Sequence, residues 1–81
     1  MKKTEREQFL KSFGNRLAAV RKQKNLSQEQ LSTDAGIDLS TLSRIERGVF
    51  NISIVNVQKI ANALHIHPKE LWEFDIPVMK K

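Results

Sequence analysis

A row of small polar and basic side chains recurs at helical spacing between residues 38 and 47, and its chemistry suits the edges of nucleic-acid bases. Its outward members are Leu39, Ser40, Ser43, Arg44 and Arg47. Arg44 carries a planar guanidinium that fits O6 and N7 of guanine, a contact worth about 1 to 3 kcal/mol of discrimination. Ser40 has a hydroxyl that can donate to or accept from several base edges, so it discriminates weakly. The row predicts a helix that lies in the major groove of DNA.

Two residues of this row are open to more than one interpretation. Arg44 lies away from the N-terminal end of its helix, which normally enters the groove deepest, so a phosphate contact competes on equal terms with a base contact. Leu39 would gain an apolar partner from a thymine methyl group. The alternatives for Leu39 are a lone surface leucine or packing against Val49 or Phe50.

The side chains of this row can face outward only if neighbouring helices bury the other side of their helix. The sequence shows a helical pattern on both sides of the row. Thr4 with Glu7 predicts a capping box for a first helix that continues to the polar stretch 22–25. Ser27 with Gln30 predicts a second capping box, and Gly36 marks the end of that second helix. The apolar residues expected to face inward from these two helices are Phe9, Phe13, Leu17, Val20, Leu31 and Ala35.

Three further helices follow from the same rules. Asp38 is expected to cap the third helix and Gly48 to end it, Ser53 to cap the fourth, and Pro68 fits the first turn of a fifth. Their inward residues are expected to be Leu42, Ile45 and Val49 in the third helix and Ile54, Val57, Ile60, Ala61 and Leu64 in the fourth, and the fifth contains Leu71, Trp72 and Phe74. No strand pattern is present, so we predict an all-α fold: one compact five-helix domain over residues 1–81, with its core in 13–74 and a short tail in 75–81.

Composition favours a small binding protein. The 81 residues carry 14 Lys and Arg against 9 Asp and Glu, a net charge of +5, which suits a phosphate backbone or an anionic surface. Cys is absent, the first residues are too charged for a signal peptide, and no apolar run approaches membrane-spanning length. We therefore expect a cytoplasmic protein that does not enter a membrane.

The residue pattern offers little for catalysis. His65 and His67 lie near Glu70, but residues two apart point to different sides and no further ligands of suitable spacing follow. His67 is better explained as a helix cap and His65 as the end of the fourth helix. We expect no enzyme activity, no metal, no cofactor and no small-molecule ligand.

The chain resembles the lambda-repressor-like helix-turn-helix domains, also called Cro-type or XRE-type. The resemblance covers roughly residues 13 to 74 and rests on several pieces that occur in order and at the right spacings. These are Gly14-x-Arg16-Leu17-x-x-x-Arg21, Leu26-Ser27-Gln28-Glu29-Gln30-Leu31, Gly36-Ile37, Leu42-Ser43-Arg44-Ile45-Glu46-Arg47-Gly48 and Ile60-Ala61-x-Ala63-Leu64.

The resemblance implies roles for residues outside the row. It implies an ion pair between Arg21 and Glu46, which we expect to be partly buried. It also implies a phosphate contact for Gln28 at the start of the second helix, where unpaired N–H groups and the helix dipole favour an anion. The alternative for Gln28 is a plain polar residue of that turn. Further contacts to the phosphate backbone of DNA are expected from Thr41, Ser43, Arg47, Asn51 and Arg16.

Two positions depart from the family pattern. Ser32 replaces the usual alanine at the corner, so either its hydroxyl bonds back to a carbonyl or the corner is looser. Ile52 replaces a frequent proline after Asn51, which suggests a loop held by burial.

The carboxyl end carries more apolar side chains than one small core can bury. We predict a homodimer interface there, formed by Trp72, Phe74, Ile76, Val78 and Met79 with help from the fourth and fifth helices. The alternative is that Trp72 or Phe74 completes the monomer core and the tail is disordered. A dimer would place two recognition helices about 34 to 36 Å apart on a pseudo-palindromic site in double-stranded DNA.

Three functions remain for this fold. The first is a transcription regulator acting as a dimer, such as the controller of a restriction-modification system. The second is an antitoxin-like protein that binds a protein partner, and the third is an interaction module that does not read DNA. The basic, small-residue face of the third helix argues against the third, because protein-binding faces more often show aromatic and Met anchors.

Overall fold

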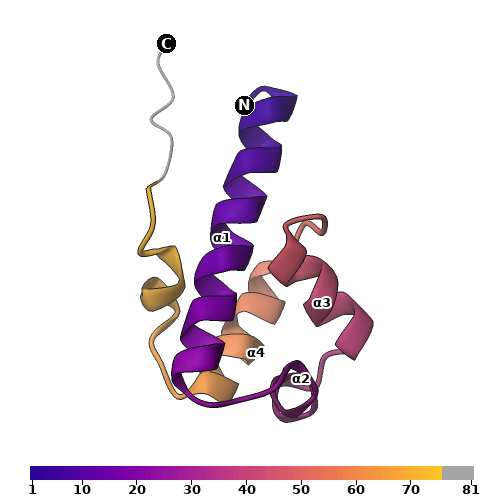
Figure 1. The fold of residues 1–81 in the computed structure, drawn as a ribbon, viewed down its shortest axis with the longest axis vertical. Coiled ribbons are helices and arrows are strands. Elements are labelled where there is room, and N and C mark those ends of the chain that lie inside the picture. The colour runs from indigo at the N-terminus through magenta and orange to yellow at the C-terminus, as the bar shows by residue number, and fades with distance from the viewer. Residues whose placement is uncertain (76–81) are drawn as a thin grey trace.

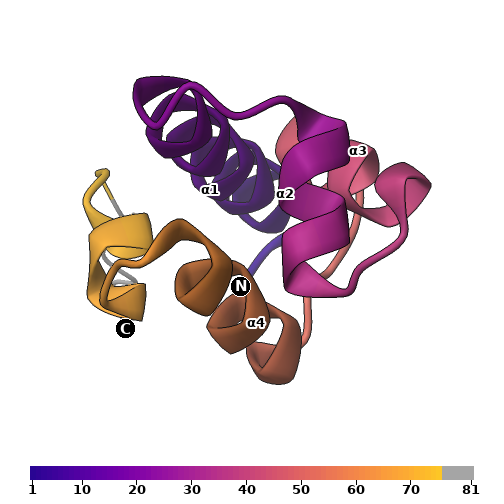
Figure 2. The ribbon, with the colours of Figure 1, turned by 90° about the horizontal axis from the view of Figure 1, so that it is seen from below.

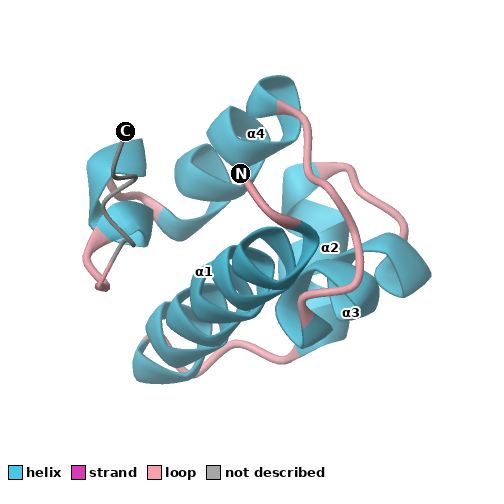
Figure 3. Cartoon of the chain, turned by 90° about the horizontal axis from the view of Figure 1, so that it is seen from above, coloured by secondary structure: helices cyan, strands magenta, loops and turns pink. Residues whose placement is uncertain are grey.

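The computed structural model describes residues 1–75 of the chain. In order, its elements are α1 (Lys3–Gln23), α2 (Gln28–Ala35), α3 (Leu39–Arg47), α4 (Ile54–Leu64) and a short 3₁₀ helix, η1 (Pro68–Trp72). The described residues contain no strand, so the all-α prediction is confirmed (Figure 3). The predicted count of five α-helices is wrong in its last member. The element after the cap at His67 spans only the five residues Pro68–Trp72, and Glu70 N donates to His67 O at 3.0 Å, the tighter bonding of a 3₁₀ helix.

Local signals set most helix ends. Ser27 Oγ accepts a hydrogen bond from Gln30 N at 3.0 Å, and Ser27 N donates to Gln30 Oε1 at 2.8 Å, so the predicted capping box of α2 is present. Gly36 and Gly48 end α2 and α3 with φ of 69° and 75°, the left-handed conformation that glycine adopts without strain. Ser53 caps α4 through its Oγ, which accepts from Asn56 N at 3.1 Å.

One predicted capping box is wrong, and one predicted cap residue is in place without its side-chain hydrogen bond. The first helix begins at Lys3, and the bond that closes its first turn runs from Lys2 N to Glu5 Oε1 at 2.9 Å instead of joining Thr4 and Glu7. Asp38 occupies the position before α3 but its side chain makes no capping hydrogen bond.

The core lies among the five elements: α1 packs against α3 and η1, α2 packs against α3 and α4, and α4 also packs against η1 (Figures 1 and 2). Its fully buried large side chains are Phe13, Leu17, Leu31, Leu42, Ile45, Ile60, Leu64 and Leu71. Val49 and Ile54 were expected inward but are 61% and 84% exposed. Each lies at the junction of a helix and a loop: Val49 follows the left-handed Gly48, and Ile54 is the first residue of α4.

Within the described part of the chain, no helix is long and apolar enough to cross a membrane.

Candidate nucleic-acid interface

The turn between α2 and α3 fixes the orientation of α3. Ile37 N donates to Ser32 O at 2.9 Å across the left-handed Gly36, and the Ile37 side chain is buried. Ser32 is also buried, and its Oγ donates to Glu29 O at 2.9 Å, so the unusual serine bonds back to a carbonyl, one of the two expected outcomes. Because Leu42 and Ile45 are buried against the core, the opposite side of α3 faces outward.

The predicted row lies on that outward side. Ser40, Arg44 and Arg47 are exposed, Leu39 is 43% exposed, and Ser43 and Thr41 are half-buried. Neither arginine forms an ion pair with any residue from 1 to 75. Their guanidinium groups are therefore available to an anionic or hydrogen-bonding ligand.

Burial distinguishes Leu39 from Phe50, one of its suggested packing partners. Phe50 packs against the hydrophobic core, and Val49 is 61% exposed, whereas Leu39 belongs to neither the core nor its half-buried margin. Leu39 thus presents apolar surface to solvent beside the exposed Ser40. Asn51 is exposed in the loop after α3, and Ile52 beside it packs against the core, as expected for a loop held by burial.

A buried ion pair supports the N-terminal end of α2. Arg21 Nε donates to Glu46 Oε2 at 2.7 Å and Arg21 Nη2 donates to Glu46 Oε1 at 3.0 Å, with both residues only 8% exposed. Arg21 Nη1 also donates to Leu26 O at 2.7 Å. The structure thus brings together the two residues that the family resemblance pairs, and the same guanidinium holds the loop leading into α2.

Sequence reasoning missed the partner of Gln28. Its Nε2 donates to Glu46 Oε1 at 3.0 Å, which draws the half-buried side chain toward the ion pair. Gln28 is the first residue of α2, where backbone N–H groups have no partner within the helix. The side chain therefore anchors a helix end whose backbone can meet a phosphate.

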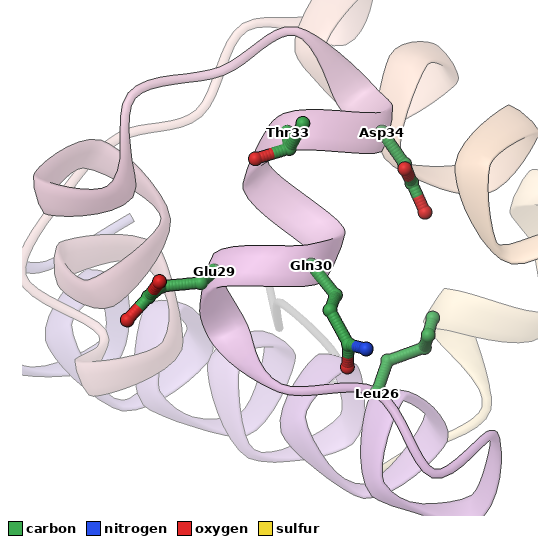
Figure 4. Close-up of a pocket in the computed structure, with 5 residues that line it drawn as sticks. All are labelled: Leu26, Glu29, Gln30, Thr33 and Asp34. Atoms are coloured by element: carbon green, nitrogen blue, oxygen red, sulfur yellow. The ribbon is translucent and has the colours of Figure 1, made fainter.

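Part of the outer face of α2 carries negative charge, beginning with Glu29 in its first turn. A shallow hollow there is lined by Leu26, Glu29, Gln30, Thr33 and Asp34 (Figure 4). Glu29 and Asp34 are both exposed, and two carboxylates would repel a phosphate backbone.

Arg16 is tied into the fold on another side. Its Nε donates to the backbone O of Glu70 at 2.9 Å, which links α1 to η1, and the residue is half-buried. This contact gives Arg16 a structural role that the sequence did not indicate.

The carboxyl-terminal aromatic residues lie against α1. Trp72 stacks on Phe9 with ring centroids 5.9 Å apart and packs against Phe13 at 5.0 Å. Phe74 is half-buried and lies 5.9 Å from Phe9. Trp72 keeps 37% of its surface exposed. The other predicted interface residues, Ile76, Val78 and Met79, lie outside the described residues.

The histidines serve helix ends. His67 Nδ1 accepts a hydrogen bond from Lys69 N at 3.0 Å and so caps η1, as predicted. His65 follows α4 with φ of 58°, the left-handed conformation that ends the helix. Among residues 1–75, no group of three or more His, Cys, Asp or Glu is placed to hold a metal ion.

The family model described as helix-turn-helix matches residues 17–71. The chain belongs to this helix-turn-helix family. It is 40% identical over 63 residues to control protein C.BamHI of Bacillus amyloliquefaciens, a match that covers 76% of this chain and 78% of the relative. It is 43% identical over 61 residues to control protein C.MunI of a Mycoplasma species, covering 74% and 82%.

Solved structures agree with this assignment. The restriction-modification controller protein C.AhdI of Aeromonas hydrophila is 48% identical, with a TM-score of 0.76 over 76% of this chain and 94% of that one. Family membership identifies the helix-turn-helix chain as a DNA-binding regulator of transcription and not an enzyme.

Proposed function

We propose that this helix-turn-helix protein controls the genes of a restriction-modification system, as a homodimer on a pseudo-palindromic operator with α3 of each copy in the major groove. The observation that carries the proposal is the outward face of α3, where Arg44 and Arg47 are exposed and take no part in an ion pair among residues 1–75. Similarity to C.BamHI, C.MunI and C.AhdI, all named as control or controller proteins, supports the controller role.

The residues of this face divide by chemistry. Arg44 is assigned to a guanine or a neighbouring phosphate, Ser40 to a base edge, and Leu39 to a thymine methyl group. Backbone phosphates are assigned to the first turn of α2 and to a set of polar side chains. That set is Arg16, Gln28, Thr41, Ser43, Arg47 and Asn51, of which Arg16 and Gln28 also bond within the fold.

An exposed apolar surface supports the homodimer. Ile54, Val55, Val57, Gln58, Pro68 and Trp72 line a shallow hollow between α4 and η1, here named the α4–η1 patch. Ile54 is 84% exposed, Val55 61% and Trp72 37%, and no charged residue lines the hollow. A second copy of the chain is the proposed occupant, because a two-fold axis pairs the apolar patch of one copy with the same patch of the other.

The test of DNA reading is selection from a random duplex pool at about 150 mM salt, followed by fluorescence anisotropy with the selected site. Selection should enrich a palindrome. Arg44→Ala should weaken binding to it by about 1 to 3 kcal/mol and relax preference at the contacted position if Arg44 reads a base. A uniform loss across sequences would assign Arg44 to a phosphate.

The matched control is Lys59→Ala, which removes an exposed cation from α4 and should leave the sequence preference unchanged. Failure of the pool to enrich any sequence would overturn the proposed operator and turn attention to a protein partner for the α4–η1 patch.

A further inference from the structure

We propose that the N-terminal half of α1 forms a second DNA-backbone contact beside α3, in addition to the helix-turn-helix face. The site is a groove lined by Lys3, Arg6, Glu7, Leu10, Lys11, Gly48 and Val49, here named the N-terminal groove. It joins the first turns of α1 to the residues that directly follow α3. The proposal rests on the DNA binding set out above and adds a surface to it.

The groove exists because α1 is long at its N-terminal end. The helix begins at Lys3, whereas the family match begins at residue 17. Figure 1 shows the first turns of α1 rising beyond the loop after α3, and Figure 3 shows the same end of α1 beside that loop. These early turns are therefore an addition to the matched motif, placed at the end of α3 that carries Arg47.

A close backbone contact fixes the two walls. A Cβ atom built at Gly48 would lie 2.5 Å from Lys11 Cα, so only glycine lets the end of α3 approach α1 this closely. Gly48 also needs its left-handed conformation, with φ of 75°. The spacing between the basic side chains of α1 and the end of α3 is thus set by backbone packing.

The charge of the groove suits a phosphate backbone. Lys3, Arg6 and Lys11 are exposed cations, and Glu7 is the single acid among the lining residues. None of the three cations forms an ion pair with another residue of the described chain. Leu10 and Val49 supply an apolar floor that the stems of the basic side chains can cover.

The favoured occupant is DNA because the groove is continuous with the face assigned to the major groove. Val49 and Gly48 follow Arg47 directly in the chain, and Arg44 and Arg47 lie in the last turn of α3. When α3 lies in the groove, the sugar-phosphate strand beside its C-terminal end is the nearest polyanion. We assign Lys3, Arg6 and Lys11 to that strand as positioning contacts that carry no base preference.

The test uses the triple variant Lys3→Gln, Arg6→Gln, Lys11→Gln and the selected palindromic duplex. The plot of log affinity against log salt should become shallower by about 5, because the dimer loses three phosphate contacts from each of its two copies and each lost contact changes the slope by about 0.9. The base preference of the variant should remain that of the original chain. Ethylation interference should show the loss of the phosphates nearest the end of α3.

The matched control is Lys22→Gln, Lys24→Gln, Lys59→Gln, which removes the same charge from exposed positions at the other end of α1 and on α4. Equal salt slopes for the two triple variants, or an unchanged ethylation pattern, would overturn the proposal. If the triple variant unfolds, Lys3→Gln with Arg6→Gln should still lower the slope by about 4, since the dimer then loses two contacts from each copy. No sequence-specific binding by the original chain would instead overturn the proposed function, and this site with it.

Discussion

The carboxylate of Glu46 is the point at which three helices meet. It lies on α3, accepts two hydrogen bonds from Arg21 of α1 and a third from Gln28 of α2. A buried ion pair of this kind contributes little net stability over an apolar pair, but removing one member leaves the other charge without compensation. The network therefore makes the position of α3 relative to α1 and the start of α2 sensitive to one side chain.

Glu46→Ala is expected to lower the free energy of unfolding by about 3 to 5 kcal/mol, because it leaves the buried Arg21 guanidinium unpaired. Urea denaturation followed by circular dichroism measures the change. The control is Glu29→Ala, which removes an exposed acid from α2 and should change stability by less than about 0.5 kcal/mol. A melting temperature for Glu46→Ala equal to that of the original chain would contradict the prediction.

Side-chain contacts between residues far apart in the chain could not be predicted from the sequence pattern. The family resemblance implied that Arg21 and Glu46 pair, but Gln28 lies 18 residues from Glu46 and its amide contact was not foreseen. Arg16 and the Glu70 carbonyl are 54 residues apart. Helical periodicity gives the face on which a residue lies, but it does not say which neighbouring chain that face will meet.

The crossing of α1 and α3 depends on Gly14. A Cβ atom at this position would collide with the backbone oxygens of Ile45 and Glu46, and backbone atoms cannot move aside as a flexible side chain can. Glycine within a helix normally lowers stability by about 1 kcal/mol relative to alanine. Here that cost is offset by the close approach of the two helices.

Gly14→Ala is therefore expected to destabilise the protein by about 1 to 3 kcal/mol, the range for overpacking, although helix propensity alone predicts a gain. Thermal and urea unfolding give the sign. Ala19→Gly is the control, since Ala19 is exposed on the same helix and its replacement should cost about 1 kcal/mol through propensity alone. A Gly14→Ala variant more stable than the original chain would show that the helices do not cross as described.

Helix ends were predictable where a single turn determines them, and less so where packing decides. Ser27, Gly36 and Ser53 act within a few residues, so local sequence was sufficient. Val49 and Ile54 were placed inward by extending a helical period into residues where the backbone direction changes. The predicted fifth α-helix is wrong: Pro68–Trp72 is a 3₁₀ helix whose Trp72 packs on Phe13 of α1.

At the scale of the whole molecule, the aromatic residues join the two ends of the described chain. Phe9 and Phe13 of α1 contact Trp72 and Phe74, which closes the domain over residues far apart in sequence. These two carboxyl-terminal aromatics were expected at a dimer interface, and their packing on α1 engages part of that surface. Exposed apolar surface from Ile54, Val55 and Trp72 lies together in the α4–η1 patch, where the proposed dimer would form.

Val55→Asp tests that arrangement against a closely matched control. Val55 and Val49 are both 61% exposed, but only Val55 lies in the α4–η1 patch. A buried, unpaired carboxylate at a two-fold interface should raise the dimer dissociation constant at least about tenfold, equivalent to about 1.4 kcal/mol, measured by sedimentation equilibrium. Val49→Asp should leave that constant unchanged.

Loss of the dimer should also change how DNA is bound. The Val55→Asp variant is expected to bind a half-site duplex with the affinity of the original chain, because α3 is unchanged. It should bind the full palindrome with lower affinity and a less steep binding curve, since the two half-sites are then bound by separate monomers instead of one dimer. A dimer that forms equally in both variants would place the interface elsewhere. A dimer lost without any change on the palindrome would separate assembly from operator recognition, and would leave the monomer as the DNA-binding unit.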